Sequence, residues 1–119
     1  MKEKRDFSNE ELAQIIENHR KWLNDEEGGK RADLSYAVLR GAKMNGVDLS
    51  NADLFEADLS YASLRNADLS NAVLIYVNLN EADLSEANIS NADLRNAELI
   101  GANLSGADLN NVELSNAIL

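Results

Sequence analysis

Leucine recurs at every fifth position from Leu34 to Leu119, with Met44 and Ile89 as the two substitutes, over 18 consecutive positions without a break. Alanine, or Val at three places, stands two residues before each of them, and Asp, Asn or Glu mostly lies between. An α-helix turns by ~100° per residue, so residues five apart would be separated by about 140° and would spiral around the helix axis. The spacing therefore excludes an amphipathic helix over residues 32–119.

Each five-residue unit is predicted to form one side of a coil. Ala points inward, Asp outward and Leu inward, as in a short β-strand. The two residues that follow are mostly Ser, Asn, Arg, Gly, Glu or Tyr, and Asn, Gly and Ser tolerate a turn. Asn51, Asn71, Asn91 and Asn111 occupy equivalent places 20 residues apart, which indicates four units per coil.

Runs such as NADLFEADLS, residues 51–60, resemble the pentapeptide-repeat family with its A(D/N)LXX consensus. The resemblance covers residues 32–119 and implies an all-β solenoid, a right-handed quadrilateral β-helix, with the Leu and the preceding Ala pointing inward. At four units per coil, the 18 units make about four and a half coils. Each coil would pair its backbone with its neighbours, so stability should add up along the stack.

Residues 1–31 lack the repeat and are predicted to form a cap with a linker. A helix over about residues 8–24 is expected, because Ser8 and Glu11 have the spacing of a capping box and Gly28 and Gly29 end the pattern. The apolar end of a solenoid needs a cover. We expect the helix to lie across the first coil and to bury its apolar residues there, Trp22 among them. The residues at helical spacing are Leu12, Ile15, Ile16, His19, Trp22 and Leu23.

Composition excludes several classes of function. The net charge of −10 argues against direct binding of nucleic acid, which is held by Lys and Arg. The chain has no cysteine and a single histidine, so we expect no catalytic site, no metal site and no cofactor, and we predict that the protein is not an enzyme. No apolar run reaches the length of a membrane span or a signal peptide. The expected location is the cytoplasm, without membrane attachment.

An apolar strip interrupts the polar pattern and is the candidate partner-binding surface. On a four-sided coil, Phe55 and Ile75 are adjacent outward residues, Val73 lies beside them, and Tyr36 and Tyr76 share the same edge. Contiguous apolar surface often marks a contact site. The favoured interpretation is a protein-binding module that acts through its surface, with a protein partner that the sequence does not identify.

The acidic surface supports an alternative function. Residues 32–119 carry 13 Asp and Glu residues against four Lys and Arg residues. The fluoroquinolone-resistance branch of the family that this chain resembles binds DNA gyrase as a DNA-shaped decoy. The resemblance thus implies a DNA-mimic inhibitor or protector of a DNA-binding enzyme, such as gyrase or a nuclease. The candidate acids are Asp48, Asp53, Asp58, Asp68, Asp93 and Asp108.

The last coil is the candidate for self-association. The sequence ends in the repeat pattern with Ile118 and Leu119, and an open coil end would expose leucines and unpaired backbone groups. A second copy of the chain would cover this end in a two-fold arrangement. The sequence therefore predicts a homodimer through the C-terminal coil.

Overall fold

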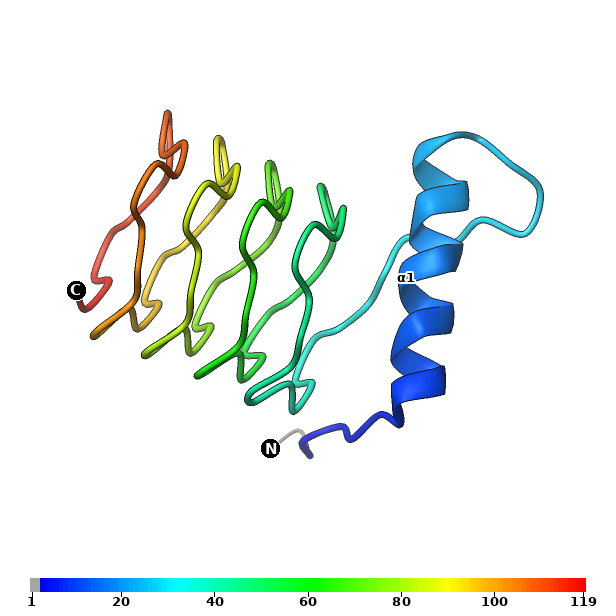
Figure 1. Cartoon of the computed structure of the whole chain (residues 1–119), viewed down its shortest axis with the longest axis horizontal. Coiled ribbons are helices and arrows are strands. Elements are labelled where there is room, and N and C mark those ends of the chain that lie inside the picture. The colour runs from blue at the N-terminus through cyan, green and yellow to red at the C-terminus, as the bar shows by residue number, and fades with distance from the viewer. Residues whose placement is uncertain (1–2) are drawn as a thin grey trace.

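The computed structural model describes residues 3–119, and it consists of one helix followed by a stack of coils (Figure 1). Helix α1 (Asn9–Leu23) lies at one end of the stack, and the C-terminus lies at the other end (Figure 1). The chain leaves α1 through a loop, returns to the stack and winds away from the helix. Within residues 3–119, no helix has the length and apolar character needed to cross a membrane.

The coils pair with a constant period of 20 residues. Every β-bridge within the repeats is parallel and joins residues 20 apart, from Asp33 with Asp53 to Glu98 with Ile118. The period of four units per coil is thus confirmed. Each unit contributes one bridged residue and then turns, so residues 3–119 contain isolated bridges and no longer strand. The sides of the coil are shorter than ordinary strands because a corner follows the third residue of every five-residue unit.

A four-residue turn at every corner explains the last two positions of the unit. The N–H of Ala57 donates to the carbonyl of Leu54 at 3.0 Å, and the equivalent bond recurs from unit to unit. The fifth residue of the unit has a positive φ at all 17 corners from Tyr36 to Asn116. Asn and Gly, which adopt this left-handed conformation at low cost, fill 11 of these corners.

The Asp or Asn in the second position of the unit also stabilises the corner. Asp68 Oδ1 accepts hydrogen bonds from the Ser70 N–H at 2.9 Å and from the Ser70 hydroxyl at 2.6 Å. Asn88 binds Ser90 in the same way. Short polar side chains that accept a backbone hydrogen bond two residues on are typical of turns. The acidic consensus residue therefore has a structural role in addition to its charge.

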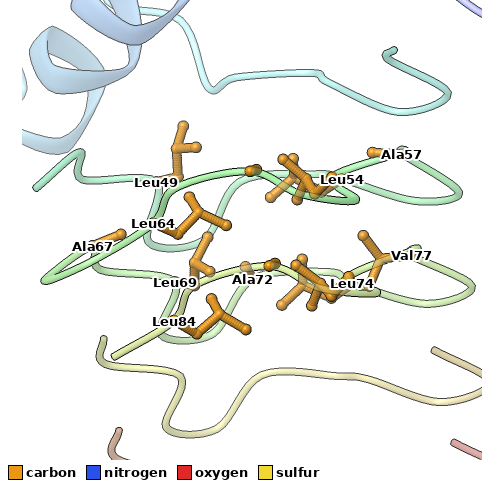
Figure 2. Packing of buried hydrophobic residues seen from close by; sticks show 14 of the residues in the cluster. Leu49, Leu54, Ala57, Leu64, Ala67, Leu69, Ala72, Leu74, Val77 and Leu84 are labelled. Carbon is orange, nitrogen blue, oxygen red and sulfur yellow. The ribbon is translucent and has the colours of Figure 1, made fainter. Parts of the chain in front are cut away.

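The core is a column of leucines and alanines along the axis of the stack. Figure 2 shows Leu49, Leu54, Leu69 and Leu74 pointing into the space that the coils enclose. The central leucines are essentially inaccessible to solvent, and the alanines beside them are equally buried. The side chains of successive coils pack densely, so the leucines and alanines of each coil are stabilised by those of the next coil.

α1 begins with the expected capping box. The N–H of Glu11 donates to Ser8 Oγ at 3.1 Å, and the N–H of Ser8 donates to Glu11 Oε1 at 2.7 Å. Phe7, Leu12 and Ile16 pack against the core cluster. These contacts fix the helix on the first coil.

The prediction that Trp22 is buried against the first coil is wrong. Trp22 is 40% exposed, and the fully buried residue of α1 is His19. His19 Nδ1 accepts from the N–H of Ala32 at 2.9 Å, so Nε2 carries the proton and donates to the carbonyl of Ser50 at 2.8 Å. The coil end presents backbone donors and acceptors that an indole could not match. Trp22 instead stacks on the outside of His19, with ring centres 5.4 Å apart.

Candidate partner-binding surface

Three aromatic side chains form a ladder across successive coils. Phe55 lies between Tyr36 and Tyr76, with ring centres 5.6 and 6.2 Å away and both contacts edge to face. The backbone sets this arrangement, because the N–H of Tyr36 donates to the carbonyl of Phe55 at 2.8 Å. Edge-to-face pairs stabilise by about 0.5–1.5 kcal/mol beyond their buried area.

Two aliphatic residues complete this surface. Val73 bridges to Asp53, and the carbonyl of Ile75 accepts from the N–H of Glu56 at 2.9 Å, which places Ile75 in the coil next to Phe55. Val73, Ile75 and Phe55 are half-buried, while Tyr76 is 54% exposed. The structure thus brings all five residues of the candidate surface together on one side. We call them the aromatic strip: Tyr36, Phe55, Val73, Ile75 and Tyr76.

All three tyrosines of the chain occupy left-handed corners. The φ angles of Tyr36, Tyr61 and Tyr76 are 62°, 60° and 59°. For a residue with a bulky side chain this conformation costs roughly 1–2 kcal/mol, which Gly avoids and Asn reduces. Backbone strain of this kind clusters at functional sites. Tyr therefore stabilises a corner less than Asn or Gly does, whereas its aromatic ring is suited to a contact surface.

A second aromatic contact lies on the next side of the coil, and the sequence reasoning missed it. The guanidinium of Arg40 lies 4.4 Å from the ring centre of Tyr61 and donates to Ser60 Oγ at 3.2 Å. The spacing of 21 residues between Arg40 and Tyr61 is the signal that could have found it, since residues 20 apart are stacked. Tyr61 and Ile100 are both exposed.

The six candidate DNA-mimic acids all hold corners and are spread over three sides. Asp48, Asp68 and Asp108 follow one track, connected through bridges that include Asn88. Asp53 and Asp93 lie on the side of the aromatic strip, and Asp58 lies on the next side. In each case Oδ1 accepts the N–H two residues on, from Ser50, Phe55, Ser60, Ser70, Arg95 and Asn110 in chain order.

Some of the carboxylates are further stabilised in their ionised form. Hydrogen bonds from the Arg95 guanidinium hold the pKa of Asp93 below its ordinary value of 3.8. The hydroxyl of Ser85 lowers the pKa of Asp83, with a smaller contribution from Arg65. Both carboxylates are therefore charged at neutral pH. Within residues 3–119, no three His, Asp or Glu side chains are grouped so that they could hold a metal ion.

The candidate self-association residues are exposed on the last coil. Ile118 is 52% and Leu119 is 75% exposed. Leu109 and Leu114 of the same coil are also exposed, whereas their equivalents Leu69 and Leu74 are buried. The last coil thus exposes four large aliphatic side chains.

The solved structures that resemble this one include Rfr23, HetL and alr5209. Rfr23 from the cyanobacterium Cyanothece 51142, a pentapeptide repeat protein, is 42% identical with a TM-score of 0.73 over 74% of this chain and 60% of Rfr23. HetL from Nostoc sp. strain PCC 7120, a pentapeptide repeat protein involved in heterocyst differentiation regulation, is 39% identical with a TM-score of 0.73, over 77% of this chain and 42% of HetL. The pentapeptide repeat protein alr5209 from Nostoc PCC 7120 is 38% identical, with a TM-score of 0.72, over 82% of this chain and 74% of the alr5209 chain.

This chain therefore spans less than two thirds of Rfr23 and of HetL. A comparison with curated proteins finds no match. The sequence profile of pentapeptide repeats matches eight copies, over residues 32–71, 52–91 and 87–119. The repeats thus form a right-handed β-helix solenoid, as the relatives do. The profile and the solved relatives agree with the five-residue spacing, and the chain belongs to the pentapeptide repeat family.

Proposed function

We propose that this protein is a non-enzymatic binding module that docks a partner protein on the aromatic strip. The observation that carries the proposal is the ladder Tyr36–Phe55–Tyr76, in which both tyrosines occupy left-handed corners that Asn or Gly would fill at lower cost. Aromatic residues are enriched in protein interfaces, and Tyr dominates many binding hot spots.

The surroundings of the strip indicate the chemistry of the partner. Asp53, Glu56 and Asp93 lie beside or between the aromatic residues, and the whole chain carries a net charge of −10. A complementary surface therefore has apolar side chains at its centre and Arg or Lys at its rim. The arginines can lie over the exposed ring of Tyr76, as Arg40 already lies over Tyr61. Such charges would raise the rate of association, and the apolar centre would keep the partner bound in high salt.

DNA mimicry is the alternative, and its support is the excess of acids. A mimic needs its charges gathered on one or two sides. One track of bridged residues carries Asp33, Asp53, Asp93 and Glu113, and another carries Asp48, Asp68 and Asp108. The same three carboxylates hold the corners of their own units. Corner formation accounts for their presence without a DNA-binding partner, so the strip is the favoured surface.

Capture of partners from source-cell lysate by matched variants tests the proposal. The double variant Phe55→Ser with Ile75→Ser removes the centre of the strip, and it should lose a partner that the wild-type protein retains in high salt. Ile100→Ser is the control, because it removes an exposed aliphatic side chain from a neighbouring side. Retention of the partner by the strip variant would contradict the proposal.

A second set of variants tests the alternative on an intact fold. Asp48→Asn, Asp68→Asn and Asp108→Asn remove three charges while keeping the Oδ1 acceptor, as Asn88 does in the native chain. Loss of a salt-sensitive DNA-binding enzyme from this triple variant alone would favour mimicry. Binding through the strip predicts that the triple variant keeps the partner.

Self-association through Ile118 and Leu119 stays a prediction. The exposure of both side chains supports it. Sedimentation velocity at high micromolar concentration should show a dimer that Leu119→Asp dissociates. A monomer at that concentration would contradict it.

A further inference from the structure

Three of the four sides of the first coil form hydrogen bonds with the N-terminal segment. On the first side, the N–H of Ala32 donates to His19, and on the fourth side the carbonyl of Ser50 accepts from His19. On the second side, the N–H of Val38 donates to the carbonyl of Arg5 at 2.8 Å, so the chain around Arg5 pairs with this side as a parallel strand would. The cap thus supplies the partners that a preceding coil would otherwise provide.

The third side, residues 42–46, receives no hydrogen bond from residues 3–31. In the next coil, the N–H of Ser63 donates to Ala42 and its carbonyl accepts from Met44. The equivalent N–H and carbonyl of Lys43 have no protein partner among the described residues. Ala42 is half-exposed, whereas Ala62 in the next coil is buried. The cap therefore leaves one strand edge of the solenoid open.

A groove of about 680 Å³, lined by both apolar and polar groups, lies between this open edge and α1. Such a volume is within the usual range of ligand sites. Its apolar walls come from both regions of the molecule, from the start of the chain and α1 on one side and the first coil on the other. The apolar lining residues are Phe7, Leu12, Ile16, Val38, Leu39 and Ala42.

The groove carries positive charge although the protein is acidic. Arg40 and Lys43 line it and are two of the four cations in residues 32–119, and no Asp or Glu lines it. The ammonium group of Lys43 forms no ion pair with residues 3–119. A carboxylate at the mouth of the groove would therefore meet an unopposed cation.

We propose that this groove binds an extended segment of a partner protein that carries aliphatic residues next to Asp or Glu. The backbone of the segment adds to the third side as a short strand and uses the N–H and carbonyl of Lys43. An aliphatic side chain enters between α1 and the coil, and an acidic side chain pairs with the Lys43 ammonium group. Arg5 already makes the same kind of backbone addition on the adjacent side. The groove is separate from the aromatic strip and prefers the opposite charge.

Selection from random peptides displayed on phage tests the proposal with the full chain as the target. Peptides about eight residues long are sufficient, since a typical strand has five or six. Enriched peptides should carry aliphatic residues alternating with Asp or Glu. A synthetic copy of the leading peptide should shift the NMR amide signals of Gly41, Ala42 and Lys43 and slow hydrogen exchange at Lys43.

Two pairs of variants locate the site. Ala13→Trp fills the groove from an exposed position on α1, and Gln14→Trp places the same side chain next to it but outside the groove. Only Ala13→Trp should weaken the peptide, by at least about tenfold, because it removes the apolar site. Lys43→Glu should weaken it as well, whereas Lys30→Glu, the same charge change outside this groove, should not.

Four results would overturn the proposal. They are enrichment of basic peptides, affinity that is unchanged in Ala13→Trp and Lys43→Glu, amide shifts confined to the aromatic strip, and no enrichment at all. Two other results would also contradict the proposal. Binding of laurate in place of peptides would assign the groove to a fatty acid, and a dimer that Ala13→Trp dissociates would assign it to a second copy of the chain. The aromatic-strip variant Phe55→Ser with Ile75→Ser should keep peptide affinity, so the two sites are tested independently.

Discussion

The two regions of this molecule are stabilised in different ways. In residues 32–119 each bond recurs 20 residues later, so every coil repeats the contacts of its neighbour. In residues 3–31 each contact occurs once, and single side chains such as His19 and Arg5 replace the hydrogen bonds of a missing coil. A repeat region distributes its stability over many similar parts, whereas a cap depends on a few specific ones.

A buried leucine in the middle of the stack should give the largest effect on stability. Leu69→Ala removes a fully buried side chain between two intact coils, and we expect it to lower the free energy of unfolding by ~2–5 kcal/mol. Chemical denaturation measures the change. The same substitution at Leu79, on another side of the solenoid, is the matched comparison. A loss below about 1 kcal/mol at both positions would show that the core tolerates cavities.

His19 should be nearly as important, although its effect should be local. His19→Ala leaves a buried N–H and a buried carbonyl without partners, each at a cost of about 1–3 kcal/mol. We expect faster hydrogen exchange at Leu34 and Leu49 in the first coil and unchanged exchange at Leu84. His19→Gln keeps one donor and one acceptor and should restore part of the protection. Equal acceleration in all coils would show that cap and repeats unfold as one unit.

Substitutions at the corners should distinguish the cost of the left-handed backbone from the stabilisation by the aromatic contact. Glu56→Asn relaxes a left-handed corner that carries no aromatic side chain, and it should stabilise the fold by about 0.5–1 kcal/mol. Tyr76→Asn relaxes the same strain but removes the contact with Phe55, so the two effects should nearly cancel. Thermal denaturation of both variants measures the difference. A clear destabilisation in Glu56→Asn would show that these corners are not strained.

Acid should weaken the junction between the two regions by the smallest amount. The hydroxyl of Ser35 and then Arg5 hold the pKa of Asp33 below its ordinary value of 3.8. Its contribution is thus complete above 3.8 and is lost as the pH falls through the lower pKa of the folded protein. Because the pair with Arg5 is exposed, we expect a loss below about 1 kcal/mol. Asp33→Asn should remove this part of the pH dependence, and an unchanged profile would contradict the assignment.

Much of the repeat region could be predicted because its contacts join residues separated by 20 positions in the sequence. The five-residue spacing predicts the leucines in the core, and the 20-residue period predicts Phe55 beside Ile75. The role of the aspartates was less predictable. Their charge was evident from the sequence, but the hydrogen bond that Asp68 accepts from the Ser70 N–H depends on the backbone direction in the turn. An acidic residue in the consensus is therefore poor evidence for DNA mimicry on its own.

The cap was predictable as an element and unpredictable in its contacts. The capping box and the helical spacing identified α1, yet the spacing could not show that His19 is buried and Trp22 is not. Burial at the end of a coil depends on matching backbone donors and acceptors, which a hydrophobicity pattern does not record. The Arg40–Tyr61 contact was missed although the coil period brings the two residues close, because the period does not set the direction of the Arg40 side chain.

The sequence by itself determined the coil, because a strict five-residue period of Leu and Ala can bury its apolar side chains in only one way. Tertiary structure alone decided how that coil is closed at its N-terminal end. Residues 3–31 have no period, and they cover the first, second and fourth sides of the first coil but not the third. The open edge at Lys43 follows from the path of residues 3–31, which bond the other three sides and leave this part of the backbone without partners.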